Sequence, residues 1–394
     1  MIAVFWTSLF LVVYTYLGYG LVLFTLVRLK RLINRSKNLG PVDYEPEVTL
    51  LIAAYNERDF VAQKVENTRQ LDYPSHKLHQ VWITDGSDDG TPDLLRNYSG
   101  VTVLHESARR GKIAAMNRGM QRVHTPIVIF SDANTILGRE SVRRIVRLFS
   151  DPKVGCVSGE KRIQKTDKEA AASAGEGLYW RYESTLKKWD AELYSVVGAA
   201  GELFAVRTAL FEEVEPDTLL DDFIISLRIA MRGYTTQYDP EAYAMEVASA
   251  NVQEELKRKI RIAAGGFQSI VRLAPLLNFF RYGILSFQYI SHRVLRWTLA
   301  PLALPVIFIS NAFLWTHGNL YQVLFVGQCF FYAAALLGWW LANRRIKGKV
   351  LFVPYYFLMM NYAVYRGFGR YMQKKQDVRW ERARRAAVKD EVAG

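Results

Sequence analysis

Long uncharged apolar stretches lie at the two ends of the 394-residue chain, and short apolar runs alternate with polar segments between them. Residues 2–27 carry no charge and are long enough to cross a bilayer. Residues 298–316 and 320–343 form two more apolar stretches, with Trp, Tyr and Phe near their ends. Residues 350–365 are a weaker candidate. The pattern predicts an integral membrane protein.

Basic residues in the loops predict which side of the membrane each part occupies. "RLKRLINRSK" follows the first span and "RRIKGK" the third, whereas "THGN" between the second and third has no Lys or Arg. By the positive-inside rule the N-terminus lies outside, and residues 28–297 are cytosolic at the plasma (inner) membrane. Pro354 and Asn361 make residues 350–365 a poor simple span. If that segment dips and returns, or lies along the interface, the basic tail stays in the cytosol.

Between the apolar ends, β-rich runs alternate with helical patterns. The expected strands are "VTLLIAAYN", "HQVWITD", "VTVLHE", "PIVIFSDAN" and "VGCVSGE". The expected helices lie near residues 58–70, 90–98, 111–123 and 139–149. This alternation predicts an α/β domain with a mainly parallel sheet, whose ligands bind outside the carboxyl ends of the strands.

Polar residues follow three of the expected strands. Asn56 and Glu57 follow the first, Asp85 the second, and Asp132 and Asn134 the fourth. Carboxylates beside basic groups suit a nucleotide diphosphate bound with a divalent metal. The net charge of +13 also indicates anionic partners. By itself, "TDGSDDGT" could equally be a polar turn that caps a helix.

Several other chemistries lack their signatures. No G-x-G-x-x-G follows the first expected strand, and "RRGKI" lacks the upstream Gly and following Ser or Thr of a P-loop. Cys156 and Cys329 are too few for a disulfide framework, and no Cys/His cluster has zinc spacing. A nucleic-acid binder would not need membrane spans around a carboxylate-lined site. The sequence therefore argues against a dinucleotide oxidoreductase, a P-loop enzyme and a nucleic-acid partner.

Six motifs occur in a fixed order along the middle of the chain: "AAYNE", "TDGSDDGT", "RRGKIAAMN", "SDANT", "GAAGELFAVR" and "LLDDFIISLRIAMRGY". In order and rough spacing they resemble family 2 glycosyltransferases, in particular the membrane-integrated branch with cellulose, chitin, hyaluronan and poly-N-acetylglucosamine synthases. The resemblance covers about residues 45–275. It implies a GT-A, Rossmann-like cytosolic domain flanked by transmembrane and interfacial helices.

The resemblance assigns nucleotide-binding roles to residues that match the family motifs. It implies that Tyr55, Glu57 and Asp85 line the nucleoside pocket. It also implies that Lys112, and with it Arg110, lies near the base and diphosphate. Asp89 and Asn117 match positions that support the site.

The metal motif departs from the family pattern. Asp132 matches the first Asp of the family's Asp-x-Asp, but Asn134 stands at the second. An amide oxygen can ligate Mg²⁺ or Mn²⁺ without bringing charge, so the resemblance still implies a divalent metal, bound less tightly or through water.

The resemblance also implies a catalytic base and an acceptor loop. Asp222 of "LLDDF" matches the final Asp of the family motif and would be the general base of an inverting transfer. The alternative is that the Asp pair caps a helix, a role that Asp221 would fill. Gly198 and Gly201 lie in a loop resembling the one where the acceptor sugar docks, and they would let it approach the backbone.

The family's Gln-x-x-Arg-Trp signature is altered. At its expected place the chain reads "KRKIRIAAGG", where Arg261 matches the motif Arg but Ile262 replaces Trp. The resemblance implies that Arg261 lies near the diphosphate; the alternative is a basic helix that binds lipid headgroups. "QDVRW", residues 376–380, fits the signature but lies in the basic tail. Trp380 would supply the missing acceptor platform, or the string is a coincidence in a tail that binds acidic lipid.

The motifs together predict a metal-dependent, inverting glycosyltransferase that uses a nucleotide sugar, such as a UDP-sugar, to extend a β-linked polysaccharide. Two alternatives stay open: transfer of one sugar to a lipid-linked acceptor, and a non-catalytic scaffold or channel in a polysaccharide export complex. The sugar, linkage, processivity, oligomeric state and export partners are not fixed by the sequence. The expected parts are a transmembrane helix (1–28), a cytosolic GT-A domain (29–252), interfacial helices (253–297), a membrane region (298–366) and a cytosolic tail (367–394).

Overall fold

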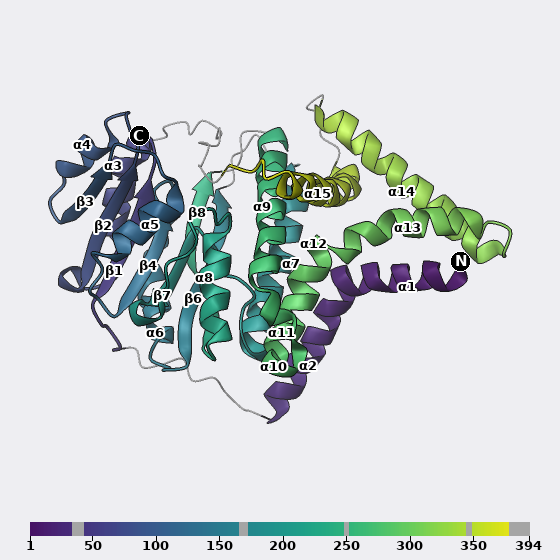
Figure 1. Cartoon of the computed structure of the whole chain (residues 1–394), viewed down its shortest axis with the longest axis horizontal. Helices are drawn as coiled ribbons and strands as arrows, with labels where there is room; N and C mark the ends of the chain where they lie inside the picture. Colours follow the sequence, from purple (N-terminus) through teal and green to yellow (C-terminus); the bar gives the residue numbers. More distant parts are fainter. Residues whose placement is uncertain (34–42, 165–171, 248–251, 344–348, 378–394) are drawn as a thin grey trace. The chain divides into compact units, whose positions relative to one another are not determined.

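The computed structural model describes residues 1–33, 43–164, 172–247, 252–343 and 349–377, and the chain divides into two compact units (Figure 1). Of the described residues, the α/β unit comprises 31–33, 43–164, 187–247 and 377. The membrane unit comprises described residues 1–30, 172–186, 252–343 and 349–376. Residues 172–186 thus group with the membrane helices, although they lie inside the expected GT-A domain. The domain boundaries stay predictions.

Among the described residues, the α/β unit contains one eight-stranded sheet with the spatial order β3-β2-β1-β4-β7-β6-β8-β5. Its strands are β1 (Val48–Ala54), β2 (Leu78–Asp85), β3 (Val101–Glu106), β4 (Ile127–Asp132), β5 (Ile136–Leu137), β6 (Val154–Gln164), β7 (Leu203–Arg207) and β8 (Thr235–Val247). Strands β3, β2, β1 and β4 run parallel, as do β6 and β8, whereas β7 is antiparallel to β4 and β6, and β5 to β8. The predicted α/β class with a mainly parallel sheet is confirmed.

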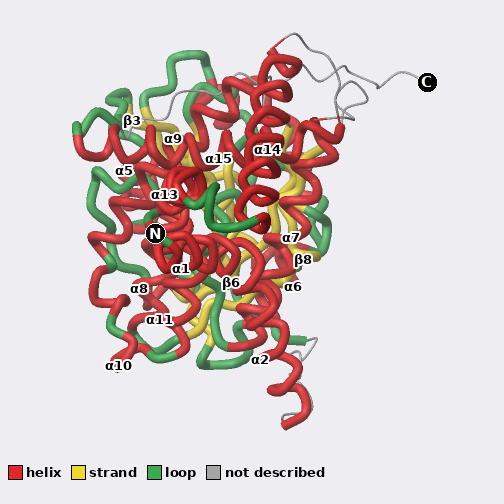
Figure 2. Tube along the Cα trace, turned by 90° about the vertical axis from the view of Figure 1, so that its right-hand side faces the viewer, coloured by secondary structure: helices red, strands yellow, loops and turns green. Residues whose placement is uncertain are grey.

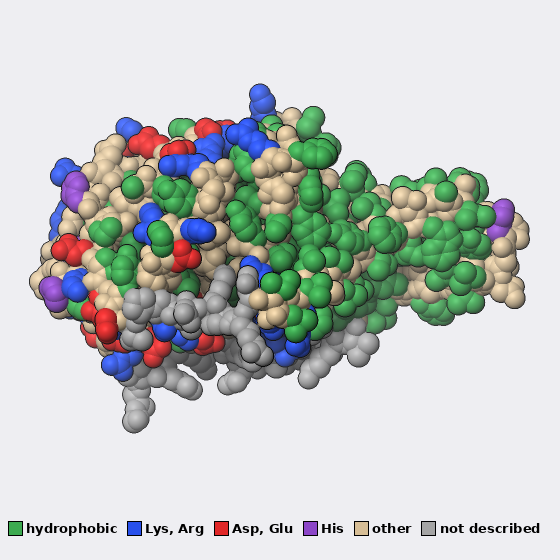
Figure 3. Space-filling view, turned by 90° about the horizontal axis from the view of Figure 1, so that it is seen from below, with side chains coloured by type: hydrophobic (Ala, Val, Ile, Leu, Met, Phe, Trp, Pro, Cys, Tyr) green, Lys and Arg blue, Asp and Glu red, His purple; other side chains and the backbone are tan. Residues whose placement is uncertain are grey.

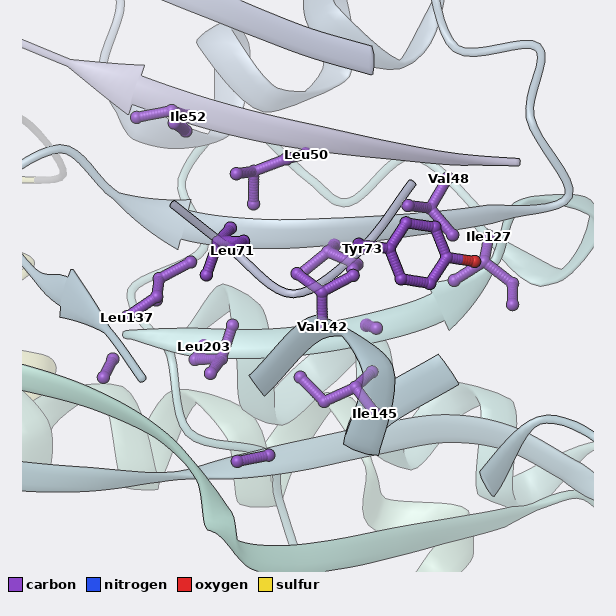
Figure 4. Close-up of a cluster of buried hydrophobic side chains, with 14 of the residues drawn as sticks. Val48, Leu50, Ile52, Leu71, Tyr73, Ile127, Leu137, Val142, Ile145 and Leu203 are labelled. Carbon is purple, nitrogen blue, oxygen red and sulfur yellow. The ribbon is translucent and has the colours of Figure 1, made fainter. Parts of the chain in front are cut away.

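Helices cover the central strands because these strands are apolar on both faces. The helices are α3 (Arg58–Arg69), α4 (Thr91–Arg96), α5 (Lys112–Met120), α6 (Ser141–Leu148) and α8 (Asp221–Met231). All seven residues of β1 are buried. Alternate side chains such as Leu50 and Ile52 share one face, where the buried cluster in Figure 4 also contains Val142 and Ile145 of α6.

Helix α5 packs tightly against β1 and β2. A Cβ at Gly119 would lie 2.6 Å from Ile83 Cδ1 and 2.9 Å from Leu51 Cδ1, so only glycine permits this approach. Because α5 begins at Lys112, its packing fixes where the Lys112 side chain leaves the backbone beside the strand ends.

The membrane unit contains two described helices that are long and apolar enough to cross a membrane, Ile2–Ile33 and Asn319–Leu341. The first joins α1 (Ile2–Val13) and α2 (Tyr19–Ile33) through a π-helical turn, and the second lies in α14 (Asn319–Asn343). The span expected at residues 298–316 differs: α13 (Leu299–Phe313) follows the segment Ile284–Trp297 at a 53° bend, so a third span exists only if this bent pair is one span.

The other described helices of the membrane unit are α9 (Val252–Arg272), α10 (Phe279–Tyr282), α11 (Ile284–Tyr289), α12 (Leu295–Trp297) and α15 (Lys349–Met372). Helix α7 (Ala172–Leu193) is divided between the two units after Leu186. Helix α1 contacts α13, and α15 contacts both α14 and α9 (Figure 2). Large apolar side chains are exposed along α1, α13 and α14, and Figure 3 shows hydrophobic side chains over much of the surface of the membrane unit. That surface suits a lipid environment.

Helix α15 resolves part of the ambiguity over residues 350–365. It is one helix of 24 residues that continues through Pro354, so it lacks the turn that a dipping and returning segment requires. Asn361 is buried, and its Oδ1 accepts a 2.8 Å hydrogen bond from the Tyr16 hydroxyl. This contact between helices removes the polar penalty that made the segment a poor span. Whether α15 crosses the membrane or lies along it stays open.

Candidate active site

The parallel register brings the polar strand ends of the α/β unit to one edge of the sheet. Ala53 of β1 lies opposite Asp132 of β4, and Ala54 lies opposite Thr84 of β2, which Asp85 follows. Neighbouring strands are about 4.8 Å apart, so Asp85 and Asp132 flank the end of β1 at a distance of two strand spacings.

A pocket opens at this edge. Its lining residues come from the ends of β1 and β2 and from the start of α5: Ala53, Ala54, Tyr55, Asp85, Arg109, Gly111, Lys112 and Ala115. Three predicted nucleotide-binding residues, Tyr55, Asp85 and Lys112, are therefore brought together. The fourth residue of the α/β unit with this predicted role, Glu57, is buried and bonded to the metal motif as described below.

Asp85 holds the loop before α5 and keeps one oxygen without a hydrogen bond. Its Oδ2 accepts hydrogen bonds from the backbone N–H of Arg110 (3.0 Å) and Gly111 (2.6 Å). Its Oδ1 is buried and has no hydrogen-bond partner among the described residues, with Arg118 Nη1 at 3.9 Å. A buried carboxylate oxygen in this state favours a hydrogen-bond donor from a ligand.

The neighbouring residues of "TDGSDDGT" have structural roles. Asp89 accepts hydrogen bonds from the backbone N–H of Thr91 (2.9 Å) and of Arg58 (3.1 Å), which ties the loop to the start of α3. These bonds hold the pKa of Asp89 below its usual value, against the opposing effect of partial burial. Asn56 and Asp88 exchange two hydrogen bonds of 2.8 and 3.0 Å. The turn interpretation of this motif and the ligand interpretation of Asp85 are therefore compatible.

Arg109 is a pocket residue that the motif comparison missed. Its guanidinium carbon lies 3.8 Å from the centroid of the Tyr55 ring, a cation–π contact. Gly86, at φ +68°, allows this approach, because a Cβ there would lie 2.6 Å from Arg109 Cβ. Arg110, which the sequence favoured, has an exposed side chain 3.6 Å from Glu106. The two arginines are adjacent in "RRGK", so the sequence alone could not tell which one faces the pocket.

Lys112 is the cation at the centre of the site. Its Nζ lies 2.8 Å from Asp132 Oδ1 and 3.7 Å from Asp221 Oδ2. Burial lowers the pKa of Lys112, but the carboxylates of Asp132, Asp221 and Asp222 outweigh that effect, and the pKa is raised overall. Burial raises the pKa of Asp132, and Lys112 partly offsets this rise. The two carboxylates thus hold a permanent ammonium between them.

The metal motif offers oxygen donors, and its second residue contacts Glu57, a residue predicted to bind the nucleotide. Asn134 Nδ2 donates a 3.3 Å hydrogen bond to Glu57 Oε1, while Asn134 Oδ1 is buried without a hydrogen-bond partner among the described residues. In the part of the chain that is described, no group of three or more His, Cys, Asp or Glu could hold a metal alone. Asp132 and Asn134 fit a Mg²⁺ or Mn²⁺ ion that takes its other oxygens from phosphates and water.

Asp222 occupies the second position of α8. The helix N-cap is Leu220, so neither Asp221 nor Asp222 is the capping residue, although both lie in the first turn where the helix dipole favours carboxylates. Burial and the neighbouring Asp221 carboxylate raise the pKa of Asp222 to about 7, although Lys112 opposes the rise. A half-buried carboxylate with this pKa has the properties of a general base near neutral pH.

The two glycines of the predicted acceptor loop differ in how closely they are packed. Gly198 has φ +88°, and a Cβ there would lie 2.2 Å from Phe223 Cδ2. A Cβ at Gly201 would lie 3.1 Å from Asp222 Oδ2. Gly201 therefore places the loop directly against the predicted base, whereas Gly198 is explained by its backbone conformation and by Phe223. Their contact with an acceptor stays a prediction.

Two predicted site residues do not belong to the described part of the α/β unit. Arg261 belongs to α9 of the membrane unit. The apolar stripe of that helix, including Ile260 and Ala264, packs against α15, where a Cβ at Gly367 would lie within 2.9 Å of both residues' backbone. Trp380 lies outside the described residues. The predicted roles of Arg261 and Trp380 stay predictions.

The α/β unit combines a mainly parallel sheet with a basic residue set among carboxylates at one sheet edge, and its fold is that of a GT-A transferase. Residues 46–265 match the model of the glycosyltransferase-like family 2, which is more than half of the chain, and the protein belongs to this family. The predicted family membership and GT-A fold are confirmed, and with them a glycosyltransferase.

Curated relatives include polysaccharide synthases. The poly-beta-1,6-N-acetyl-D-glucosamine synthase of Staphylococcus aureus (strain MSSA476) is 25% identical over 250 residues, which cover 61% of this chain and 59% of the relative. The synthase of the same name from Staphylococcus epidermidis (strain ATCC 35984) is 23% identical over 235 residues, which cover 57% of this chain and 56% of the relative. The chain thus spans less than two thirds of the length of these relatives.

A solved structure shares the fold over nearly the whole chain. The mannosyltransferase PcManGT from Pyrobaculum calidifontis, in complex with GDP-Man and Mn²⁺, superposes with a TM-score of 0.70. The match covers 95% of this chain and all of that one, at 22% sequence identity. The similarity therefore includes the helices of the membrane unit as well as the sheet.

Proposed function

We propose that this protein is a membrane-integrated, metal-dependent, inverting glycosyltransferase. It transfers a sugar from a nucleotide sugar, such as a UDP-sugar, to a growing β-linked polysaccharide. The observation that carries this proposal is the cluster of Lys112, Asp132 and Asp221 beside Asp222, at the strand ends that line the pocket. The named product of the staphylococcal relatives, a β-1,6-linked polymer, supports the polysaccharide assignment.

The nucleotide binds in the pocket. Tyr55 supplies an aromatic face and Asp85 Oδ1 accepts a hydrogen bond from the base. Arg109 and Lys112 line the same pocket and neutralise diphosphate charge. Arg261 adds to this neutralisation if α9 approaches the nucleotide, as its match to the family signature predicts.

Asp132 and the amide oxygen of Asn134, which has no hydrogen-bond partner among the described residues, would hold the metal. A divalent cation there would supply positive charge to the departing diphosphate. The Mn²⁺ bound to PcManGT supports a divalent metal in this fold, and Mg²⁺ and Mn²⁺ both suit the oxygen donors. Lys112 stays protonated and contributes charge on the same side of the sugar.

Asp222 is the general base. Its carboxylate accepts the proton of the acceptor hydroxyl as the acceptor oxygen attacks the anomeric carbon. The bond from that carbon to the nucleotide diphosphate breaks on the opposite face, so the configuration inverts. Gly198 and Gly201 shape the acceptor side, and Gly201 brings the loop backbone to the Asp222 carboxylate. Trp380 completes this side if the tail returns to the site.

A second candidate function is transfer of one sugar to a lipid-linked acceptor. The observation that favours it is the small number of candidate spans in the described residues, two or at most three, which leaves few helices to enclose a polymer path. The scaffold alternative is disfavoured because Asp132, Lys112 and Asp222 are all present and clustered.

The test is product analysis with purified protein in lipid. UDP-sugars and GDP-mannose are supplied in turn with Mn²⁺ or Mg²⁺, and products are sized. A ladder of products supports the polymerase, and one sugar on a lipid supports the second candidate. Turnover that survives complete removal of divalent metal by chelator contradicts the metal site, and absence of any transfer with an intact, nucleotide-binding protein supports the scaffold.

A further inference from the structure

A fully buried lysine lies beneath the metal motif. Lys64 is in the middle of α3, and its side chain has no exposed surface. Its Nζ donates hydrogen bonds to Ser131 Oγ (2.8 Å), to the Thr135 carbonyl oxygen (2.7 Å) and to Thr135 Oγ1 (3.1 Å). Burying an amine is costly unless each of its donors finds an acceptor, and here three acceptors surround it.

The acceptors of Lys64 flank the two metal-binding residues. Ser131 immediately precedes Asp132, and Thr135 immediately follows Asn134. Thr135 Oγ1 also donates a 2.9 Å hydrogen bond to the Asp132 carbonyl oxygen. The Lys64 side chain of α3 therefore forms hydrogen bonds at both ends of the short turn between β4 and β5. This turn carries Asp132 and Asn134.

Few contacts within the turn reach the side chain of Asn134. Asn134 Oδ1 has no hydrogen-bond partner in the described part of the chain, and its Nδ2 donates a long 3.3 Å hydrogen bond to Glu57 Oε1. The Asp132 carboxylate contacts the Lys112 ammonium on the pocket side. If the two ligand oxygens are to converge on one ion, the backbone of the turn must also be held, and Lys64 holds it from the side of α3.

We propose that Lys64 is a positioning residue of the metal site, which sets the spacing of Asp132 and Asn134 by clamping Ser131 and Thr135. The inference rests on the metal site proposed above. Lys64 itself touches neither metal nor substrate. Partners that orient metal ligands typically contribute about 10–100-fold to metal affinity. The same range is expected for Lys64.

The experiment is a Mn²⁺ titration of purified, full-length protein in detergent, followed by electron paramagnetic resonance of the free ion. Lys64→Met keeps the length and apolar stem but removes the donors, and should weaken Mn²⁺ binding by about 10–100-fold. The matched control is Asn67→Ala, one turn further along α3. It removes two hydrogen bonds of 2.8 and 2.9 Å to the Leu137 backbone, beyond the motif, and should leave Mn²⁺ affinity within about twofold while lowering thermal stability.

Transfer assays add a second readout. If Lys64 only positions the metal ligands, its substitution raises the apparent dissociation constant for Mn²⁺ and leaves the intrinsic rate unchanged. A high concentration of Mn²⁺ should therefore restore most of kcat in Lys64→Met. If Lys64→Met does not fold, Ser131→Ala removes one acceptor of the clamp and should weaken Mn²⁺ binding several-fold. Folded variants that all bind Mn²⁺ as tightly as the unaltered protein overturn the inference alone. An unaltered protein that binds no Mn²⁺ overturns the metal site and the inference together.

Discussion

At the scale of single residues, the raised pKa of the proposed base Asp222 gives a prediction for the pH dependence of the reaction. Because burial and Asp221 raise the pKa of Asp222 to about 7, its carboxylate is lost as the pH falls through that value. We expect kcat/KM to rise with pH up to about 7 and to fall by about tenfold per pH unit below it. An acid limb with a midpoint near 4 would contradict this environment.

Substitution of the same residue separates base catalysis from donor binding. Asp222→Asn should lower kcat by about 10²–10⁴, because the amide accepts no proton, and should leave UDP affinity nearly unchanged. UDP binding by calorimetry and transfer with a radiolabelled donor check the two parts. Near-normal turnover would exclude Asp222 as the base.

The hydrogen bond between Asn134 and Glu57 explains why an amide is tolerated in the metal motif. Asn134→Asp would replace a donor with a carboxylate 3.3 Å from the Glu57 carboxylate in a buried setting. We expect the metal-free protein to lose about 1–3 kcal/mol of stability and Mn²⁺ to bind more tightly, because the metal relieves the repulsion. Thermal unfolding with and without Mn²⁺ measures both effects.

A second change provides the control for that prediction. Glu57→Gln in the Asn134→Asp background restores an amide facing a carboxylate, with the roles exchanged. The metal-free stability should recover while the added charge at position 134 remains. A double variant as unstable as the single one would show that the repulsion lies elsewhere.

At the scale of elements, periodicity predicted most of the central sheet. "VTLLIAAYN", "VTVLHE" and "PIVIFSDAN" contain β1, β3 and β4, and "HQVWITD" covers β2 except its first residue, Leu78. The four expected helices contain α3 to α6, with ends that differ by a few residues. The signal was strong because parallel strands buried on both faces are continuously apolar. Strand β7 was not among the expected strands: "LFAVR" is a short apolar run inside a motif that the resemblance assigned to acceptor binding.

The candidate site was predictable only where a motif fixes both residue type and place. Asp85, Lys112 and Asp132 are close together because each follows or precedes a predicted element. Lys64 and Arg109 were missed for physical reasons. Lys64 lies at a buried position of α3, but a lysine in a helical sequence is normally expected at the surface. The orientation of Arg109 depends on the backbone at Gly86 and Gly111, both of which have positive φ.

The packing of α9 against α15 gives a prediction at the same scale. Gly367→Ala should destabilise the membrane unit by about 1–3 kcal/mol, because its Cβ would meet Ala263 Cβ at 2.6 Å and the Ala264 backbone N at 2.8 Å. Gly369→Ala, two residues along α15 and facing open space, should instead stabilise by up to about 1 kcal/mol. Thermal unfolding in detergent compares the pair. Equal effects would contradict the close approach of the helices.

At the scale of the whole molecule, the loop charges predict a cytosolic α/β unit and an external N-terminus. Cysteine labelling tests this topology. The variant used for labelling has the exposed Cys329 replaced and keeps Cys156, which is buried. A cysteine introduced at exposed His317, between α13 and α14, should react with a membrane-impermeant thiol reagent added to intact cells. A cysteine at Ala387, in the tail outside the described residues, should react only after the cells are opened. Labelling of Ala387→Cys from outside would refute a cytosolic tail.

The ion pairs of Lys112 have a consequence for how the ligands bind. In the absence of ligands, the Lys112 ammonium is paired with the carboxylates of Asp132 and Asp221. A divalent cation must compete with Lys112 for Asp132, and a diphosphate must draw the Lys112 ammonium away from both carboxylates. Because either ligand weakens the ion pairs of Lys112, its binding lowers the free-energy cost of binding the other. Mn²⁺ and UDP should therefore bind with positive thermodynamic coupling, typically about 5–150-fold and equal in both directions. At low concentration, either ligand alone would then occupy only a small fraction of the sites, and the occupancy of both would rise when they are present together.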